Sequence, residues 1–304
     1  MNKPKFIMCV GLPASGKSTH AKELAQEYDA TIFSSDDLRE EMFGDINHQD
    51  NNQELFVELH RRIKDCLLSG KSAIYDACNI NYKRRMAFLS ELKNIPCEKI
   101  CVLIATPYEE CLKRNQQRDR KVPEYVIDRM YRSFDVPWYY EGWDEIEYDS
   151  YFDHMHKLDI SPLEWVDSVM DYNQDNPHHK LTLGQHCDST LKWIDDNKGS
   201  MNLRCAARLH DCGKPYCKTF KNGKGKITDI AHYYSHEHTG SYDSLFYLYG
   251  SYHLYVAILI RWHMQPYYWE KDNNEKLHEK YHKLWGENLY KNIMMLHEAD
   301  KQAH

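Results

Sequence analysis

Short apolar runs alternate with amphipathic stretches through the first half of the chain. Four runs of mainly apolar residues have the length of buried strands, and the stretches between them carry apolar side chains at intervals of three and four. This alternation predicts a parallel sheet with helices on both faces. The expected strands are residues 6–10, 31–34, 72–75 and 99–105, and the expected helices are residues 20–28, 53–68, 83–93 and 108–117.

The pattern changes beyond residue 162, where almost every segment has helical spacing. A polar stretch at residues 221–226 interrupts it and predicts a small hairpin or a loop. At 304 residues the chain is long enough for two domains that each bury a core. We therefore expect an α/β domain over residues 1–155 and an all-α domain over residues 156–304.

Charge and composition narrow the possible partners and compartments. The net charge of -7 argues against a broadly basic surface, so a nucleic acid would need a local basic groove. The ten cysteines lack paired spacing, the first residues do not resemble a secretory signal, and no apolar run approaches the roughly 20 residues that span a bilayer. These features predict a cytoplasmic protein that does not enter the membrane. Only three of the 18 histidines lie in the first 150 residues, which indicates a second, metal-dependent chemistry beyond them.

A phosphate-binding motif follows the first expected strand. Residues 11–18 read GLPASGKS and match GxxxxGK[ST] directly before an expected helix. Glycines there let backbone N–H groups surround phosphate oxygens, and the helix directs its positive end to the same anion. Lys17 adds a full charge, and the Ser18 hydroxyl is expected to ligate the Mg²⁺ that bridges the outer phosphates. The sequence thus predicts ATP as phosphoryl donor, with contacts from Gly11, Ser15, Gly16, Lys17, Ser18 and Thr19.

The motif leaves the phosphoryl acceptor open, whether water, a small metabolite or a polynucleotide end. Asp36 and Arg39 follow the second expected strand, at the sheet edge where open α/β folds bind ligands. Asp36 is a candidate general base and Arg39 a candidate phosphate ligand, while an acidic N-cap is the structural alternative for this segment. A basic cluster further on fits either a lid over the phosphates or a solvated helix face. Its members are Lys83, Arg84, Arg85, Lys113, Arg114, Arg118, Arg120 and Lys121.

These segments carry a resemblance to a known family. The stretches GLPASGKST, SSDDLR, DACNINYKRR and LKRNQQRDRKVPEYVIDRMYRSF resemble the polynucleotide 5'-hydroxyl kinases of phage and bacterial end repair, over about residues 5–150. The resemblance implies that Asp36 is the general base and that Arg39 binds the phosphate next to the accepting hydroxyl. It further implies that Arg114 and Arg118 are lid arginines on ATP, with Arg118 contacting the transition state.

The same resemblance implies substrate contacts from Asp76 and Asn79, which follow the third expected strand. The phage members have Thr-Asn directly after the aspartate. Here two other residues, Ala77 and Cys78, separate Asp76 from Asn79.

The second half contains an adjacent His210 and Asp211 near the end of an apolar helix, with Lys214 close behind. Further potential ligands lie in distant segments that are expected to be helical. Imidazole nitrogens and carboxylate oxygens suit divalent manganese, iron, nickel, cobalt or zinc, and such an ion can activate water and polarise a phosphoryl oxygen. The candidate ligands are His186, His210, Asp211, His236, His263 and Asp300.

Five stretches of this half resemble, in order, the motifs of the HD phosphohydrolase superfamily: NPHHKLTLGQHC, RLHDCGKP, HYYSHEHTGS, RWHM and HEADK. The resemblance implies a catalytic lysine at Lys214 that assists at the phosphate and a substrate contact at His179. It also implies a primary metal site and a second site. The primary site comprises His186, His210, Asp211 and Asp300, and the second is completed by His236 and His263.

Together the two resemblances imply a bifunctional enzyme that heals RNA or DNA ends. It would phosphorylate 5'-hydroxyl ends and remove phosphate from 2' or 3' ends, leaving termini for a separate ligase. Two alternatives stay open. One is a small-molecule or nucleoside kinase fused to an HD nucleotidase, and the other is a non-catalytic regulator that binds ATP and metal.

Overall fold

The computed structural model describes residues 3–48, 50–150, 162–177, 179–247 and 253–303. The chain divides into two compact units, and each is described by itself. The first comprises Met1–Met130 and Pro137–Met155, and the second comprises Tyr131–Val136 and His156–His304. Within the described ranges no helix is both long enough and apolar enough to cross a membrane.

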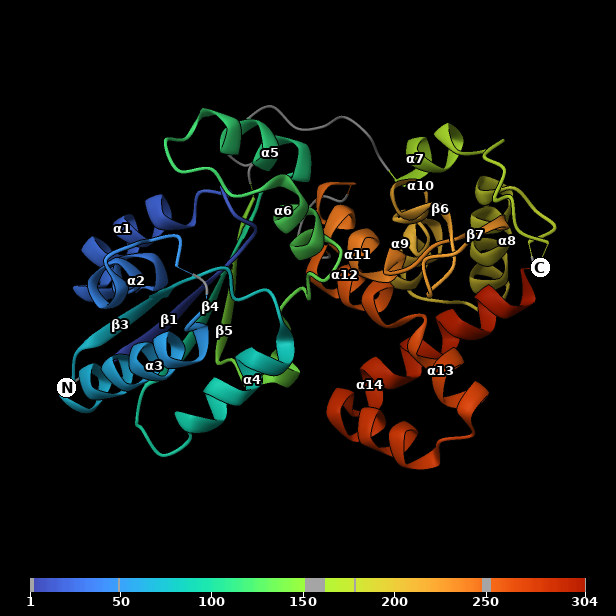
Figure 1. Ribbon diagram of the computed structural model, residues 1–304. Helices are drawn as coiled ribbons and strands as arrows, with labels where there is room; N and C mark the ends of the chain where they lie inside the picture. Colours follow the sequence, from blue (N-terminus) through green and yellow to red (C-terminus); the bar gives the residue numbers. More distant parts are fainter. Residues whose placement is uncertain (1–2, 49, 151–161, 178, 248–252, 304) are drawn as a thin grey trace. The chain divides into compact units, whose positions relative to one another are not determined.

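The first unit is built on a five-stranded sheet with the order β2-β3-β1-β4-β5 (Figure 1). All neighbouring strands are parallel. The four expected strands are present, which confirms the predicted α/β fold with a parallel sheet, and β5 is an addition. The strands are β1 (Lys5–Val10), β2 (Ala30–Ser34), β3 (Ser72–Asp76), β4 (Glu98–Ala105) and β5 (Glu145–Ser150).

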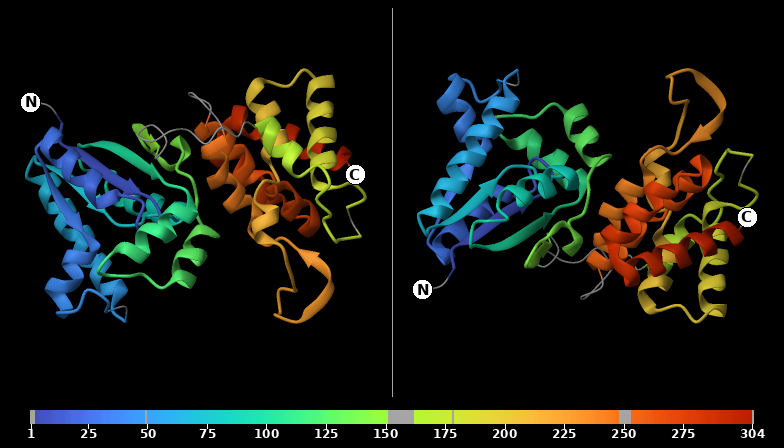
Figure 2. Two further views of the ribbon diagram at one scale, coloured as in Figure 1. Left: turned by 90° about the horizontal axis from the view of Figure 1, so that it is seen from above. Right: turned by 90° about the horizontal axis from the view of Figure 1, so that it is seen from below.

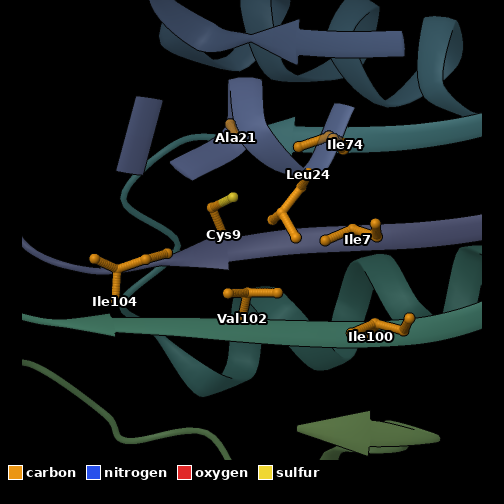
Figure 3. Close-up of a cluster of buried hydrophobic side chains, with 8 residues drawn as sticks. All are labelled: Ile7, Cys9, Ala21, Leu24, Ile74, Ile100, Val102 and Ile104. Carbon is orange, nitrogen blue, oxygen red and sulfur yellow. The ribbon is translucent and has the colours of Figure 1, made fainter. Parts of the chain in front are cut away.

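Helices cover both faces of this sheet because side chains alternate between the faces along each strand. Ala21 and Leu24 of α1 (Lys17–Tyr28) pack on one face, against the cluster drawn in Figure 3 that includes Ile7. The neighbouring Phe6 points to the other face and contacts Phe88 of α4 (Tyr82–Glu91). Phe88 in turn stacks on a histidine of α3 (Asn52–Leu68). The other helical elements are α2 (Ser35–Phe43), α5 (Tyr108–Gln117), α6 (Glu124–Tyr131) and the 3-10 helix η1 (Tyr139–Glu141).

One member of the predicted basic cluster has a structural position. The Arg85 guanidinium donates to both carboxylate oxygens of Glu141, at 2.6 and 2.7 Å, and neither side chain is exposed. It also donates to the carbonyl of Asn79. Arg85 is therefore buried inside the unit, which corrects its placement among candidate lid residues.

The described residues of the second unit form helices and one hairpin, joined by loops, and in the hairpin β6 (Thr219–Lys221) pairs antiparallel with β7 (Ile227–His232). The hairpin connects at the polar stretch 221–226, so the all-α expectation holds only for the rest of the unit. The helices are α7 (Pro162–Ser168), α8 (Leu183–Asp196), α9 (Met201–Leu209), α10 (Lys214–Cys217), α11 (His236–Tyr247), α12 (His253–Trp262), α13 (Gln265–Asp272) and α14 (Glu275–Gln302).

The segment Tyr131–Val136 groups with the second unit although its position in the sequence predicts the first. Phe134 is fully buried and its ring lies 4.6 Å from that of Tyr242. Asp135 accepts a hydrogen bond from Arg261 at 2.8 Å. Apolar contact and a buried charge pair thus hold this short segment in the helical unit.

Candidate functional site

The loop at residues 11–16 has the conformation that its sequence predicts. Ala14 and Gly16 have positive φ angles of 63° and 108°, and α1 begins directly after them at Lys17. A Cβ atom on Gly11 would lie 2.6 Å from Ser15 Oγ and 2.7 Å from the carbonyl oxygen of Ile104, so only glycine fits there. The loop is thus closely packed at its start and opens into a helix N-terminus at its end.

Lys17 and Arg114 bring positive charge to this loop. Lys17 is buried, and its Nζ donates to the carbonyl of Leu12 at 2.6 Å. Arg114, on α5, donates to the carbonyl of Ser15 at 3.2 Å. The Ser15 hydroxyl is buried without a hydrogen-bond partner among the described residues, whereas Ser18 and Thr19 are exposed. The structure therefore brings the predicted Arg114 to the loop and leaves polar groups there for an anion.

Asp36 lies in the first turn of α2, at the carboxyl edge of the sheet. The N-cap of α2 is Ser34, whose side chain accepts from the N–H groups of Asp36 and Asp37. The cap hypothesis for the acidic residues is therefore wrong, and the carboxylate of Asp36 is available for other contacts. Its two oxygens accept hydrogen bonds from Arg39, at 3.0 Å, and from Arg120.

The two arginines differ in their surroundings. Arg39 is 5% exposed and also donates to the side chain of Asn52 at 3.0 Å. Its Nε has no hydrogen-bond partner within the described part of the chain. Arg120 is more exposed and donates to the side chain of Asn47 and the carbonyl of Ile46. Arg39 is thus fixed beside Asp36, whereas Arg120 reaches it from the loop after α5.

That loop is closed by one side-chain amide. Asn115 is buried, donates to the carbonyl of Val122 at 2.8 Å and accepts from its N–H at 2.9 Å. Arg118 lies at the C-cap of α5, is exposed, and makes no ion pair with any residue that the structure describes. The sequence favours Arg118 as the lid arginine nearest the chemistry, but Arg120 is the one that contacts Asp36. No local pattern distinguishes these arginines, because the contact joins residues 84 positions apart.

Asp76 and Asn79 lie at the same edge of the sheet. Asp76 ends β3 and is in register with Cys9 of β1 and Ser34 of β2, so it lies between the phosphate loop and the segment that carries Asp36. The amide of Asn79 donates to the carbonyl of Cys9 at 3.0 Å. Asn79 thus holds the strand that leads into the loop.

The second unit gathers the six predicted ligands into two buried triads. His186, His210 and Asp300 form one, and Asp211, His236 and His263 form the other, each with its ligand atoms within 4.8 Å of one another. These residues come from five segments. Three of the six lie just beyond a helix end rather than within a helix as expected, namely His210, Asp211 and His263.

We call these six residues the histidine centre. In each of its four histidines, Nδ1 faces a backbone carbonyl. The distances are 2.8 Å for His210, 2.8 Å for His236 and 2.6 Å for His263, each to the residue three positions earlier, and 3.4 Å for His186. In a neutral imidazole, a proton on Nδ1 that is donated to a carbonyl leaves the lone pair on Nε2. The Nε2 atoms of His186 and His210 lie 3.1 Å apart, and those of His236 and His263 lie 3.3 Å apart. Each triad therefore brings two Nε2 atoms and a carboxylate to face one another.

Asp211 connects the two triads. Its Oδ1 lies 3.3 Å from His236 Nε2, while its Oδ2 lies 3.4 Å from His210 Nε2 and accepts from Lys214 at 2.6 Å. Burial acts to raise the pKa of Asp211, but Lys214 and His210 outweigh burial and hold that pKa well below its usual range. Burial acts to lower the pKa of His210, but Asp211 and Asp300 outweigh it and raise that pKa to about 10. The carboxylates thus favour positive charge at this centre.

Two further residues border the centre. Tyr267, which the sequence does not single out, donates its hydroxyl proton to Asp300 Oδ2 at 3.0 Å. The His179 ring lies 6.3 Å from that of His186, beside the first triad. Lys214 also donates to the side chain of Gln174, so its ammonium group is held at Asp211.

Comparisons with known proteins concern mainly the first unit. Residues 6–137 match the family model of the AAA domain. The chain is 27% identical over 205 residues to the L-seryl-tRNA(Sec) kinase of Methanococcus maripaludis, which covers 62% of this chain and 76% of that protein.

Two solved structures are more distantly similar. Chaetomium thermophilum Kti12 in complex with ADP-AlF3 is 18% identical, with a TM-score of 0.41, and the match covers 49% of this chain and 90% of that one. A chain of the Pnkp1/Rnl/Hen1 RNA repair complex is 22% identical, with a TM-score of 0.37, and the match covers 43% of each chain. The family match and the loop geometry agree on the class of this domain: residues 6–137 resemble the AAA domain and form an ATP-binding P-loop kinase domain.

Proposed function

We propose that the chain is a bifunctional enzyme that heals nucleic-acid ends. The first unit would transfer phosphate from ATP to a 5'-hydroxyl, and the second would hydrolyse phosphate from a 2' or 3' end. For the kinase, the carrying observation is the Asp36 carboxylate, held at the sheet edge by two arginines. For the phosphohydrolase it is the facing Nε2 atoms of the two histidine pairs.

The residues of the first unit account for the kinase reaction. Lys17 exchanges its present contact with Leu12 for phosphate oxygens, and Ser18 would hold the Mg²⁺ that neutralises the outer phosphates. The oxygen of the acceptor hydroxyl bonds to the γ-phosphorus, and Asp36 accepts the proton that this hydroxyl loses. At the same time the bond between the γ-phosphorus and the β–γ bridging oxygen breaks, and ADP leaves. Arg120 has to release Asp36 for this step. Arg39 then supplies donors to the phosphate beside the acceptor hydroxyl.

Two observations support a polynucleotide as the phosphoryl acceptor. The buried Arg39 keeps one N–H without a partner among the described residues, which suits an acceptor that carries its own phosphate. The Methanococcus relative is named for a substrate whose hydroxyl is carried by a tRNA. That name also makes seryl-tRNA a second candidate acceptor, with the serine hydroxyl in place of the 5'-hydroxyl.

The histidine centre fits divalent transition-metal ions. Two imidazole nitrogens that face each other at 3.1 Å need a proton or a metal ion between them, and buried carboxylates complete each set. Carbonyl partners at Nδ1 orient histidine ligands in metal sites, as they do here. The first ion would be held by His186, His210 and Asp300, and the second by His236 and His263, with Asp211 between them.

When bound, such ions polarise a phosphoryl oxygen and lower the pKa of water. Asp211 fixes the spacing of the two triads through its two oxygens. Lys214 holds Asp211 as a carboxylate and places a positive charge beside the position of the phosphate. His179, next to the first triad, contacts the substrate at the edge of the centre.

The kinase proposal is tested by offering ATP with 5'-hydroxyl oligonucleotides, seryl-tRNA, nucleosides and sugars as acceptors. We expect transfer to the oligonucleotide, loss of transfer in Asp36→Asn, and unchanged ATP binding in that variant. Asp37→Asn is the matched control, because Asp37 is exposed on the same helix and has the same charge. Preferred transfer to a nucleoside or sugar would overturn the polynucleotide assignment.

The phosphohydrolase proposal is tested with oligonucleotides that carry 2', 3' or cyclic phosphate, in the presence of each candidate metal. Asp211→Asn is expected to lose bound metal and phosphate release while the kinase activity persists. Asp188→Asn is the control, since Asp188 is exposed on α8. Phosphate release that survives in Asp211→Asn, or that needs no divalent ion, would contradict the proposal.

A further inference from the structure

The β6–β7 hairpin presents apolar side chains to solvent. Both views of Figure 2 show it extending from the helices of the second unit. Ile227 is 73% exposed, Phe220 is 42% exposed, and Tyr234, just after β7, is 48% exposed. Tyr234 stacks on His232, with ring centroids 5.4 Å apart and planes within 10°. The hairpin thus carries a flat, accessible aromatic pair.

The hairpin is also basic in an acidic chain. Residues 218–232 contain four lysines and one acidic residue, whereas the whole chain has a net charge of -7. Lys218 is paired with Asp175 at 2.5 Å. Lys221, Lys224 and Lys226 are exposed, and no ion pair to another described residue engages them. Three lysines therefore concentrate positive charge at the turn.

The turn that bears these lysines is ordered by side-chain hydrogen bonds. The Asn222 side chain accepts from the N–H groups of Lys224 and Lys226, both at 3.0 Å, and the Asn222 N–H donates to the carbonyl of Lys226. Gly225 takes the positive φ of 77° that the turn needs. The hairpin base is fixed as well, because the N–H of Ala231 donates to the carbonyl of Asp175.

The hairpin joins two parts of the histidine centre. It is preceded by α10, which starts at Lys214, and it leads directly into His236 at the start of α11. The carbonyl of Tyr233 accepts from His236 Nδ1 at 2.8 Å, and the Lys214 Nζ lies 5.5 Å from the Tyr233 ring centroid. Tyr234, the exposed ring, is therefore the immediate neighbour of a residue that orients a ligand.

We propose that the hairpin is the strand-binding arm of the histidine centre, and that it holds a single-stranded polynucleotide whose terminal phosphate enters the centre. Lysines at the turn contact backbone phosphates, and a base stacks on Tyr234, which is how single strands are bound without sequence preference. The proposal rests on the phosphohydrolase function proposed above and names its substrate class. Exposed lysines interleaved with aromatic rings complement a polyanion with planar bases better than they complement a small phosphate ester.

The test measures phosphate release from a short single-stranded oligonucleotide with phosphate at both ends, and from a nucleoside 3'-monophosphate. Replacing all three turn lysines by alanine is expected to raise KM for the oligonucleotide about tenfold or more and to leave the nucleotide kinetics unchanged. Because each phosphate contact contributes about 0.7 to the salt slope on a single strand, the slope of log affinity against log salt should fall by about 2. The matched control changes Lys276, Lys280 and Lys283, which are exposed on α14, to alanine.

Tyr234→Ala is expected to weaken oligonucleotide binding about tenfold, whereas Tyr234→Phe keeps the ring and the affinity. Unchanged melting temperature and metal content show that each variant is folded. Equal oligonucleotide KM and salt slope in the turn and α14 variants would overturn the arm, while phosphate release by the parent would leave the proposed function intact. A different outcome is that fluorescence anisotropy shows the oligonucleotide binding through the hairpin while neither substrate releases phosphate. That result would overturn the proposed phosphohydrolase function and leave the strand-binding role of the hairpin intact. Displacement of the oligonucleotide by an acidic peptide at lower concentrations than by a competing single strand would contradict a nucleic-acid partner.

Discussion

The buried pair of Arg85 and Glu141 connects the stability of the kinase unit to the position of its site residues. Glu141 accepts from Arg85 twice, from the Trp143 indole at 3.0 Å and from the N–H of Trp138 at 3.3 Å. Glu141→Gln keeps the shape but turns an amide NH₂ towards two of these donors and leaves the Arg85 charge buried without compensation. Breaking one partner of a buried pair costs about 3–5 kcal/mol. For a unit of this size the melting temperature should fall on the order of 10 °C.

Hydrogen exchange followed by mass spectrometry localises this effect to the first unit, which whole-chain melting does not. We expect faster exchange at the N–H of Gly11, which donates to Cys78, because Arg85 also holds the neighbouring carbonyl of Asn79. Glu58→Gln is the control, because its ion pairs with Arg61 and Arg62 are solvated and contribute little to stability. The reasoning fails if Glu141→Gln costs no more than this control. It also fails if replacing both partners by apolar residues destabilises the unit as much as the single change, since that double change removes the uncompensated charge.

Three further predictions concern single side chains. Arg120→Gln should raise phosphoryl transfer by at most about fivefold, because a partly exposed ion pair with Asp36 holds about 1 kcal/mol; a tenfold loss in steady-state kinetics would show that Arg120 acts on the transferred phosphate instead. Tyr267→Phe should weaken metal affinity about tenfold in a competition titration with a fluorescent chelator, since it removes the donor to Asp300 Oδ2, and unchanged affinity would contradict this orienting role. Burial lowers the pKa of His60 in the folded protein, so as the pH falls the imidazole is protonated first in the unfolded chain. The stability of the folded state is therefore fully present above a pH of about 6.5 and declines as the pH falls below that value. His60→Phe should flatten this dependence in urea titrations, and an unaltered slope would refute it.

The sequence predicts the sheet well because the central strands are buried on both faces. Continuous apolar runs such as residues 100–105 suit a strand that is covered on both faces, and they lie in the strands as expected. β5 escapes detection because Glu145–Ser150 pairs only with β4 at the edge of the sheet, where charged residues are tolerated. The segment Tyr131–Val136 escapes for another reason: its partners, Tyr242 and Arg261, lie more than a hundred residues away.

The two sites also differ in how far they can be predicted from the sequence, because one is made of neighbouring residues and the other of distant ones. The phosphate loop is local, so spacing alone places Gly11, Lys17 and Ser18. The histidine centre is not local: residue type identifies its six members as candidate ligands, and only the family resemblance groups them into two sites. What the sequence does not contain is the direction of the donors: the Nδ1 contacts arise where helices end, so that a carbonyl three residues earlier is free to accept from His210 and His263. The same limit explains why Arg120, and not Arg118, reaches Asp36.

The two proposed sites both bind phosphate groups, but they differ in the charge that they present before a metal ion is bound. At the loop, Lys17 and Arg114 are cationic before anything binds, so a triphosphate is attracted directly. At the histidine centre, the anionic Asp211 and Asp300 offset the positive charges of Lys214 and His210, so a phosphate gains little net attraction until divalent ions add positive charge. Removing transition metal should therefore weaken phosphate-ester binding at the centre, as well as its hydrolysis, while ATP binding at the loop is unaffected. A phosphate ester that binds the metal-free centre as tightly as the metal-loaded one would show that Lys214, and not the ions, supplies the attraction.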